Sequence, residues 1–422
     1  MQALIILKYR RKMARSKKIK NEDLETEDNQ SYDANDVLDF EKELQSFLKK
    51  DKNINVEVSA LSERESVPYW FDTQNYALNW IIGSDLRETG IPGTKVVSVE
   101  GDSGTGKSLI LGKILGDNVK KNGISYVADT EDAWDQKFVA KIVGDEKAAG
   151  KIKIIAGIKT LEDLESLLVK ICQFKAAKKD STRLILAIDS ISQLTSDSEI
   201  AIAADRTGKV DLKKAQLIKR IFRVIDNELR EANITVLLSQ HLITNIGVMF
   251  GDNKTTSGGT GVGYAADVKL RLLTAKQIQD DKSQHPLGVR LNVKVTKNRF
   301  ASFGRQCYID VLFSSGVDRY SGLAELLVRY GVLTSSAKEM SASTKLTFEL
   351  DAENAANLVD SKVYDKKTGI VSVSYKNFRS FVKDNDKLLI GIFNDRLNQN
   401  VTELEETEDI LLSEESKEEA GD

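Results

Sequence analysis

Cysteine and histidine are scarce in this 422-residue chain. It contains two cysteines, Cys172 and Cys307, and two histidines, His241 and His285. Two thiols are too few for a disulfide scaffold or a four-cysteine zinc site, and no Cys/His metal spacing exists. No stretch approaches the roughly 18 apolar residues of a membrane-spanning helix. The sequence therefore predicts a soluble, intracellular type of protein, whose hydrophobic content of 41% suffices for a globular core.

The chain also has no large excess of positive or negative charge. Its net charge of −3 is the sum of a basic N-terminal segment, a nearly neutral middle and an acidic C-terminal segment. Residues 1–20 contain eight Lys or Arg and no acid, whereas residues 401–422 contain ten Asp or Glu and one lysine. A basic start of +8 and an acidic end of −9 leave −2 for the long middle. Such asymmetry is typical of a protein with a strongly charged partner. Two solvated, disordered ends are the alternative interpretation.

The N-terminal region carries no secretory signal pattern, because its apolar run Ala3–Leu7 precedes the positive charges. Met13 is a second candidate start beside Met1. Residues 20–35 are polar and acidic, as in a linker, and an amphipathic helix is expected from Asp36 onward. That helix packs either on its own chain or on a neighbouring subunit.

From Lys95 onward, short apolar runs alternate with periodic helical segments. A helix with a capping box begins at Thr160, and Cys172 belongs to its apolar stripe, which predicts an inert core thiol. Repeated βαβ units of this kind predict an α/β fold with a mainly parallel sheet and helices on both faces. The runs, typical of strands buried on both faces, are Val96–Glu100, Ile124–Asp129, Ile152–Ala156, Leu184–Asp189 and Ile234–Leu238.

The helical pattern stops after residue 264, and strand patterns at Asp267–Thr274, Val289–Thr296 and Cys307–Phe313 predict an antiparallel extension. Weaker alternation follows and predicts a small α+β appendage. We expect four regions: a tail with a helix (1–50), a large core (51–335), a small C-terminal domain (336–400) and an acidic disordered tail (401–422).

A phosphate-binding loop is the strongest motif. Residues 101–108 read G-D-S-G-T-G-K-S, match G-x-x-x-x-G-K-[ST], and lie between a predicted strand and a predicted helix. Backbone N–H groups of such a loop converge on phosphate oxygens at a helix N-terminus, a lysine neutralises the β/γ-phosphates, and a hydroxyl binds Mg²⁺. This predicts ATP or GTP binding by Gly101, Asp102, Ser103, Gly104, Thr105, Gly106, Lys107 and Ser108.

Two carboxylates are needed beside this loop. Asp189 ends the apolar run Leu184–Asp189 and is the candidate for the metal's outer shell, although any buried strand can end in Asp at a turn. The run Ile124–Asp129 leads into several carboxylates that could position the attacking water, and spacing alone does not choose among Glu131, Asp132 and Asp135.

Several segments resemble the RecA family of recombinases. D-T-E-D-A-W-D at 129–135 is similar to the family's D-A-E-H-A-L-D, and Gly90-Ile-Pro-Gly-Thr is similar to the lead-in to its first core strand. I-G-V-M-F-G-D-N-K-T-T-S-G-G at 246–259 resembles the second DNA-binding loop of bacterial RecA nearly letter for letter. V-K-V-T-K-N-R at 293–299 is similar to the family's K-x-x-K-N-K segment. The resemblance covers about residues 75–335.

This resemblance implies roles for individual residues. Glu131 would activate water, and Asp135 would contact the adenine edge. Lys297 and Arg299 would act in trans, reaching across a filament interface to the neighbour's ATP. Phe313 lies where the family places an aromatic against adenine, with packing in the core as its alternative.

The residue that senses the γ-phosphate is open between two neighbours. Counting back without gaps from Ile246, the family's sensing glutamine falls on His241, whereas Gln240 is the adjacent alternative. UvsX-like proteins also carry histidine there. Either side chain can donate a hydrogen bond at a strand end, but only histidine changes its charge near neutral pH.

DNA binding is supported by loop chemistry rather than by charge, since the middle of the chain carries −2. Residues 246–263 hold six glycines, whose N–H groups can grip phosphates, and two large apolar side chains that can wedge between bases. A mobile loop or lid is the alternative. The candidate residues are Met249, Phe250, Lys254, Thr255, Thr256, Gly258 and Gly259, with Arg206 and Lys209 in the loop 195–211.

The resemblance implies an ATP-dependent DNA recombinase that uses ATP and Mg²⁺. It makes residues 51–335 an ATPase and DNA-binding core and the helix within residues 1–50 a polymerisation-type helix. Asp318-Arg-Tyr-Ser-Gly-Leu and the acidic tail are more similar to the phage recombinase UvsX than to the bacterial protein. We expect helical homo-oligomeric filaments on single-stranded DNA, pairing with double-stranded DNA, and a cytoplasmic location in a bacterial or phage-infected cell, away from membranes. Single-strand-binding and mediator proteins are further partners that it suggests. The alternatives are a hexameric RecA-fold DNA helicase or recombination-associated ATPase, and a DNA-assembling paralogue without turnover.

The charge distribution generates a first prediction. Deleting residues 401–422 should strengthen DNA binding and flatten its Mg²⁺ dependence, because the tail's charge of −9 competes with DNA for cationic surface. Binding of a labelled single strand, titrated with Mg²⁺ at low salt, measures both effects. Unchanged affinity at low salt would contradict the prediction.

Overall fold

The computed structural model describes residues 42–44, 46, 67–205, 214–244, 254–256, 261–279 and 285–419. Only the backbone is described for 204–205, 243–244, 254–256, 261, 275 and 404–419. The chain divides into two compact units, Met1–Glu65 and Ser66–Asp422. In the first unit, residues 42–44 and 46 are helical, and the rest of the predicted N-terminal helix lies outside the described residues. All further description concerns the second unit.

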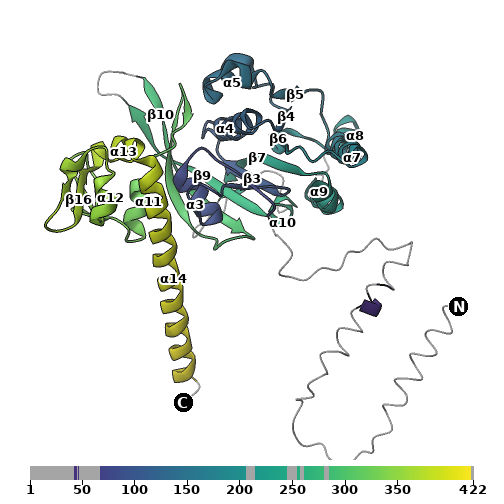
Figure 1. Cartoon of the computed structure of the whole chain (residues 1–422). Coiled ribbons are helices and arrows are strands. Elements are labelled where there is room, and N and C mark those ends of the chain that lie inside the picture. Colours follow the sequence, from purple (N-terminus) through teal and green to yellow (C-terminus); the bar gives the residue numbers. More distant parts are fainter. Residues whose placement is uncertain are drawn as a thin grey trace, which may run out of the picture. The chain divides into compact units, whose positions relative to one another are not determined.

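A large sheet forms the centre of this unit (Figure 1). Its strand order is β12-β11-β10-β9-β3-β7-β6-β4-β5. The part from β9 to β5 is parallel, and β10, β11 and β12 add an antiparallel extension at one side, which confirms the predicted fold class. The strands are β3 (Val96–Gly101), β4 (Ile124–Asp129), β5 (Lys153–Ile155), β6 (Leu184–Asp189), β7 (Ile234–Thr244), β9 (Val268–Gln279), β10 (Pro286–Asn298), β11 (Gln306–Leu312) and β12 (Gly316–Val317).

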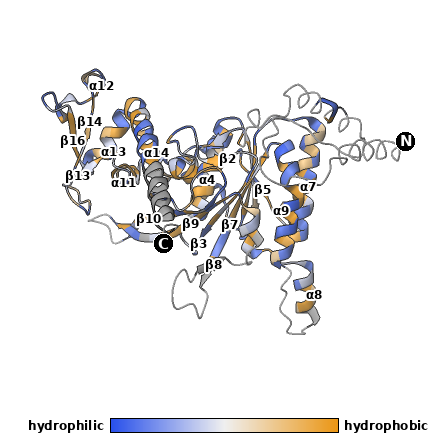
Figure 2. Cartoon of the chain, turned by 90° about the horizontal axis from the view of Figure 1, so that it is seen from below, coloured by the Kyte–Doolittle hydropathy of each residue, from blue (hydrophilic) through white to orange (hydrophobic). Residues whose placement is uncertain are grey.

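Helices cover both faces of the sheet, because successive side chains of a strand point to opposite sides. In β7, Leu237 packs in one apolar cluster and Leu238 in the other. The first cluster holds side chains of α3 (Tyr76–Gly83), α4 (Lys107–Lys120), α5 (Gln136–Val143) and α6 (Glu146–Ala149). The second holds those of α7 (Leu161–Lys178), α9 (Lys214–Glu231) and α10 (Gly261–Ala265). Figure 2 shows the hydrophobic and hydrophilic sides of α7 and α9.

The helix predicted from Thr160 shows how local sequence sets an element. The Thr160 hydroxyl accepts a hydrogen bond from the backbone N–H of Asp163, and the Asp163 carboxylate accepts one from the N–H of Thr160. This capping box begins α7 where the sequence predicted. Cys172 is buried on the inner side of α7, and burial raises the pKa of its thiol to about 11, as expected of an inert core cysteine.

The parallel register brings the functional segments to one edge of the sheet. Asp129, the last residue of β4, pairs with Asp189, the last residue of β6. Gly101, where β3 ends, pairs with His241 in β7. Carboxyl ends of parallel strands therefore meet at the edge where open α/β sheets bind ligands.

A small second sheet follows the core. Its order is β13-β14-β16-β15, and all its pairs are antiparallel. The sheet already begins at Thr334, two residues before the predicted boundary at 336. With its helices it forms the α+β appendage that the sequence predicted. The elements are α11 (Leu323–Arg329), β13 (Thr334–Ser335), β14 (Lys345–Glu349), α12 (Ala352–Ala356), β15 (Tyr364–Asp365), β16 (Ile370–Ser374), α13 (Tyr375–Asp384) and α14 (Asp386–Glu419).

The backbone of α14 is one continuous helix (Figure 1), which differs from the disordered tail expected from residue 401. Glu, Leu and Lys are strong helix formers, and no Pro or Gly interrupts the chain between Ile392 and Glu419. Among the described helices, none combines the length and apolar character needed to cross a membrane.

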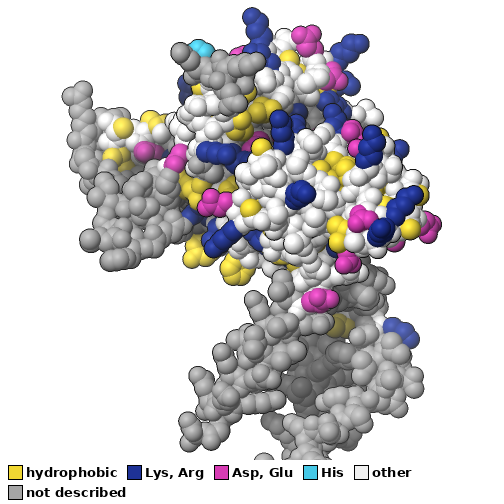
Figure 3. Space-filling view, turned by 90° about the vertical axis from the view of Figure 1, so that its left-hand side faces the viewer, with side chains coloured by type: hydrophobic (Ala, Val, Ile, Leu, Met, Phe, Trp, Pro, Cys, Tyr) yellow, Lys and Arg dark blue, Asp and Glu magenta, His cyan; other side chains and the backbone are white. Residues whose placement is uncertain are grey.

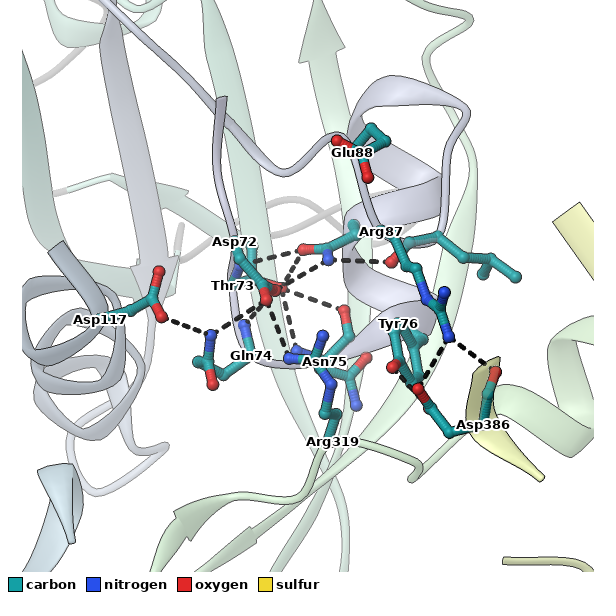
Figure 4. A network of polar contacts seen from close by, with 12 residues as sticks. Asp72, Thr73, Gln74, Asn75, Tyr76, Arg87, Glu88, Asp117, Arg319 and Asp386 are labelled. Carbon is teal, nitrogen blue, oxygen red and sulfur yellow. Dashed lines mark hydrogen bonds and ion pairs between the residues drawn. The ribbon is translucent and has the colours of Figure 1, made fainter. Parts of the chain in front are cut away.

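A polar network joins α3, β12–α11 and the start of α14 (Figure 4). The buried Asn75 caps α3 by accepting from the N–H of Leu78, and its amide nitrogen donates to the carbonyl oxygens of Asp318 and Ser321 at 2.7 and 3.0 Å. Asp386, the first residue of α14, accepts hydrogen bonds from the Tyr76 hydroxyl at 2.6 Å and from Arg87 at 2.7 Å. These contacts hold the C-terminal helix against the core.

We expect Asn75→Ala to lower the free energy of unfolding by about 2–3 kcal/mol, because it removes a helix cap and leaves two buried carbonyl oxygens without this donor. Urea unfolding followed by circular dichroism measures the change. The matched control is Asn398→Ala at an exposed position of α14, expected within about 0.5 kcal/mol of the parent. Equal stability of the two variants would refute the importance of the Asn75 contacts.

Candidate nucleotide-binding site

The predicted phosphate loop connects β3 to α4. Gly104 and Gly106 have positive φ angles of 76° and 82°, which glycine adopts readily and other residues rarely do. Gly106 is the N-cap of α4, so the N–H groups of the first helical turn point out of the helix at this end. The Thr105 hydroxyl donates to the carbonyl oxygen of Asp102 at 2.8 Å and closes the loop. The loop therefore has the conformation that anion binding requires.

Lys107 is buried against its own loop. Its Nζ donates to the carbonyl oxygens of Gly101 and Asp102 at 3.0 and 2.9 Å. Burial lowers the pKa of the Lys107 ammonium, while the carboxylates of Asp189 and Glu131 oppose this shift. The ammonium is thus already desolvated where a phosphate group would meet it.

Asp189 and Ser108, the two residues predicted to serve Mg²⁺, are in direct contact. The Ser108 hydroxyl donates to Oδ2 of Asp189 at 2.6 Å. The other carboxylate oxygen, Oδ1, accepts a hydrogen bond from the Ser239 hydroxyl on β7. Asp189 is buried, and each of these donors compensates for part of its lost hydration.

Glu131 lies in contact with His241 and Ser190. Its Oε1 is 2.8 Å from His241 Nε2 and accepts from the Ser190 hydroxyl at 2.5 Å. Burial by itself raises the pKa of Glu131, but the hydrogen bonds from Ser190 and His241 outweigh it, so the pKa is lowered from its usual value. The carboxylate is therefore ionised at neutral pH.

The neighbours Gln240 and His241 point to different places. His241 lines the cavity of the phosphate loop, and its Nδ1 lies 3.4 Å from Nζ of Lys107. Gln240 is fully buried within the sheet, where its side-chain oxygen accepts from the Ser98 hydroxyl at 3.0 Å. Alternation along β7 separates the two side chains. Of the two candidates, His241 is the one whose side chain reaches the pocket.

These groups line one cavity of about 320 Å³. Phe313 is 48% exposed at its rim, beyond the end of β11, so the alternative of core packing is wrong for this residue. Phe138 on α5 also lines the cavity, although sequence reasoning missed it; its spacing after the Glu131 segment was the available signal. The lining residues are Ser103, Gly104, Gly106, Lys107, Ser108, Leu109, Glu131, Phe138, Asp189, His241 and Phe313.

Asp135 is not among the lining residues. It caps α5, where its Oδ1 accepts a hydrogen bond from the N–H of Phe138 at 2.8 Å. Its predicted contact with adenine therefore stays a prediction. The cap does place Phe138 at the cavity by fixing where α5 begins.

The predicted DNA-binding loop begins where β7 ends. A short strand, β8 (Lys254–Thr256), lies inside the segment and pairs with β7, so that Leu242 faces Thr256 and Thr244 faces Lys254. Thr255 lies between them in the pairing, and no side chain of β8 is described. In the loop 195–211, residues Asp197–Asp205 form α8. Six candidates, Met249, Phe250, Gly258, Gly259, Arg206 and Lys209, lie outside the described residues.

The two predicted trans-acting cations lie near the end of β10. Nζ of Lys297 donates to the carbonyl oxygens of Gly263 and Tyr264 in α10 at 3.0 and 3.3 Å. Arg299 forms an ion pair of 2.9 Å with Asp267, although its side chain is 55% exposed. Neither lines the cavity of its own chain.

Charge is finely mixed on the face shown in Figure 3. Lys and Arg side chains there are interspersed with Asp, Glu and hydrophobic side chains instead of forming one basic patch. This distribution agrees with the nearly neutral middle of the sequence.

Comparison with known proteins places this site in a family. The RecA N-terminal domain matches residues 62–318. Protein RecA of Leptospira meyeri is 26% identical over 247 residues, 58% of this chain and 60% of that protein. Protein RecA of Kineococcus radiotolerans is 28% identical over 58% of this chain and 67% of that protein. Protein RecA of Bacteroides thetaiotaomicron is 26% identical over 300 residues, which are 71% of this chain and 86% of that protein. The chain spans about 60% of the length of the Leptospira proteins that it matches.

The matched segment exceeds half of the chain and contains the phosphate loop, Glu131, Asp189 and His241. The chain belongs to the RecA family.

Proposed function

We propose that this protein is an ATP-dependent DNA recombinase of the phage type represented by UvsX, acting in the cytoplasm of a bacterial or phage-infected cell. One observation carries the proposal: β7 leads directly from His241 in the nucleotide cavity to the segment that resembles a DNA-binding loop. Leu242, the residue after His241, already pairs with Thr256 of that segment. A movement of His241 is therefore transmitted to the loop through one strand, without an intervening element.

The residues present fit ATP with Mg²⁺. The phosphate loop supplies N–H groups and Lys107 for the phosphates, and Phe138 and Phe313 supply apolar surface at the same cavity. Among the described residues, no group of three or more His, Cys, Asp or Glu could hold a metal alone. Mg²⁺ is commonly held by one or two protein ligands, phosphate oxygens and waters, and Ser108 with Asp189 meets this need. Bound there, Mg²⁺ would neutralise charge on the phosphates.

For hydrolysis, the proposed roles follow from the contacts. Glu131 is ionised and accepts hydrogen bonds, so it can orient and deprotonate an attacking water. His241 contacts Glu131 and approaches Lys107, so it is placed to respond to a γ-phosphate. ATP binding would favour the loop conformation that binds DNA, and hydrolysis would release it.

The proposed assembly is a helical filament on single-stranded DNA that pairs with homologous double-stranded DNA and exchanges strands. Lys297 and Arg299 would act on the ATP of the next subunit, which requires a head-to-tail contact that does not close. Single-strand-binding and mediator proteins are proposed as accessory partners. A hexameric RecA-fold helicase or recombination-associated ATPase would instead form closed rings.

Single-stranded DNA should stimulate ATP hydrolysis, and the same mixture should show filaments in negative-stain images. Lys107→Ala and Glu131→Gln should each lower the stimulated rate by about 100-fold or more, because they remove phosphate neutralisation and the general base. Lys121→Ala and Glu353→Gln, at exposed positions outside the cavity, are matched controls that should retain the rate. A rate that survives Glu131→Gln would contradict the assigned base, and closed rings would favour the helicase.

His241→Ala should abolish the increase in DNA affinity that ATP causes, while DNA binding without ATP remains. Gln240→Ala should leave this coupling intact and instead lower the free energy of unfolding by about 1–2 kcal/mol, since it removes a buried hydrogen bond with Ser98. Anisotropy titrations of a labelled single strand, with and without ATP, measure the coupling. If only Gln240→Ala uncouples the two, the assignment of the sensor to His241 is wrong.

A further inference from the structure

Trp134 connects the two halves of the nucleotide site. Its indole Nε1 donates a hydrogen bond of 2.9 Å to Oδ2 of Asp189. Trp134 follows β4 in the segment that carries Glu131, whereas Asp189 ends β6. The indole is 8% exposed, so this bond is shielded from water.

The segment that carries Glu131 is internally fixed. The Asp129 carboxylate accepts hydrogen bonds from the backbone N–H groups of Glu131, Ala133 and Trp134, at 3.2, 3.3 and 3.0 Å. The side chain of Asp129 thereby fixes the backbone conformation of residues 129–134. A displacement of Trp134 would therefore displace the backbone of Glu131 as well.

At the other end of this connection, Asp189 receives donors from three directions. Its Oδ2 accepts from Trp134 and from Ser108, and its Oδ1 accepts from Ser239. These donors come from different elements and hold the plane of the carboxylate. Without the indole N–H, Oδ2 would keep only Ser108, a residue that must itself serve the metal.

Packing alone does not explain this hydrogen bond. The Trp134 ring packs edge-on against Phe138, with ring centroids 6.0 Å apart, and phenylalanine could make the same contact. Trp80 shows that this protein also buries an indole whose N–H has no hydrogen-bond partner among the described residues. The N–H of Trp134, in contrast, points at the carboxylate predicted to serve Mg²⁺.

We propose that Trp134 is a positioning residue that orients Asp189 for Mg²⁺ and ties it to the segment bearing Glu131. The metal carboxylate and the general base are then held as one unit, although they come from different strands. This inference rests on the proposed function, because it assigns Asp189 to the metal and Glu131 to the base.

The test compares Trp134→Phe, which keeps the ring packing and removes the N–H, with Trp80→Phe as the matched control. Binding of a fluorescent, non-hydrolysable ATP analogue is titrated with Mg²⁺ and, separately, measured in EDTA. Loss of a side chain that orients a metal ligand typically weakens metal affinity 10- to 100-fold. We expect Trp134→Phe to raise the half-saturating Mg²⁺ concentration by about tenfold, with unchanged binding in EDTA, and Trp80→Phe to leave both values unchanged.

A second measurement is independent of how well Trp134→Phe folds. When Trp70 and Trp80 are both replaced by Phe, Trp134 is the one tryptophan of the chain. Mg²⁺ together with a non-fluorescent, non-hydrolysable ATP analogue should then change the tryptophan fluorescence, because Trp134 touches the carboxylate of Asp189. The proposal is overturned if Trp134→Phe and Trp80→Phe show the same Mg²⁺ dependence, or if this fluorescence is insensitive to Mg²⁺ while the analogue binds. Absence of Mg²⁺-dependent binding in the unmodified protein would instead contradict the proposed function.

Discussion

The hydrogen bonds to Asp189 are the interactions on which the arrangement of this site depends. Ser108 from the phosphate loop, Ser239 from β7 and Trp134 from the segment after β4 all donate to its carboxylate. A buried carboxylate is stable only when donors replace its lost hydration, so these elements must stay close together. The parallel register supplies that closeness by ending β3, β4 and β6 at the same edge. The cavity, the proposed general base Glu131 and the proposed sensor His241 lie at this same edge.

The other charged groups of the cavity are also compensated within the protein. Lys107 donates to carbonyl oxygens of its own loop, and Glu131 accepts from Ser190 and contacts His241. A bound triphosphate would replace some of these contacts, so its net contribution would be the difference between the old and the new hydrogen bonds. Under the proposed function, this exchange would connect the nucleotide to the loop. A group that attracts Lys107 would also change the surroundings of His241, and β7 continues from His241 into the paired strand β8.

The charge of this chain does not by itself indicate that the protein binds nucleic acid. The middle of the chain is nearly neutral, and one face mixes cations with anions (Figure 3). Backbone N–H groups of a glycine-rich loop can bind phosphate oxygens, and apolar side chains can insert between bases, without help from a cationic side chain. The two predicted trans-acting cations also have partners within their own chain. Lys297 donates to carbonyl oxygens, and Arg299 pairs with Asp267.

The phosphate loop, the parallel core with its antiparallel extension, and the cap of α7 could be predicted from the sequence, because these depend on spacing and periodicity within short segments. The sequence also placed Asp189 at a strand end. Three features became visible in the folded chain alone: His241 faces the cavity while Gln240 is buried, Phe313 lines the cavity, and Trp134 reaches Asp189. Side-chain direction at a strand end depends on register, and contacts between distant segments depend on packing. A short stretch of sequence therefore predicts neither the side-chain direction nor the contacts between distant segments.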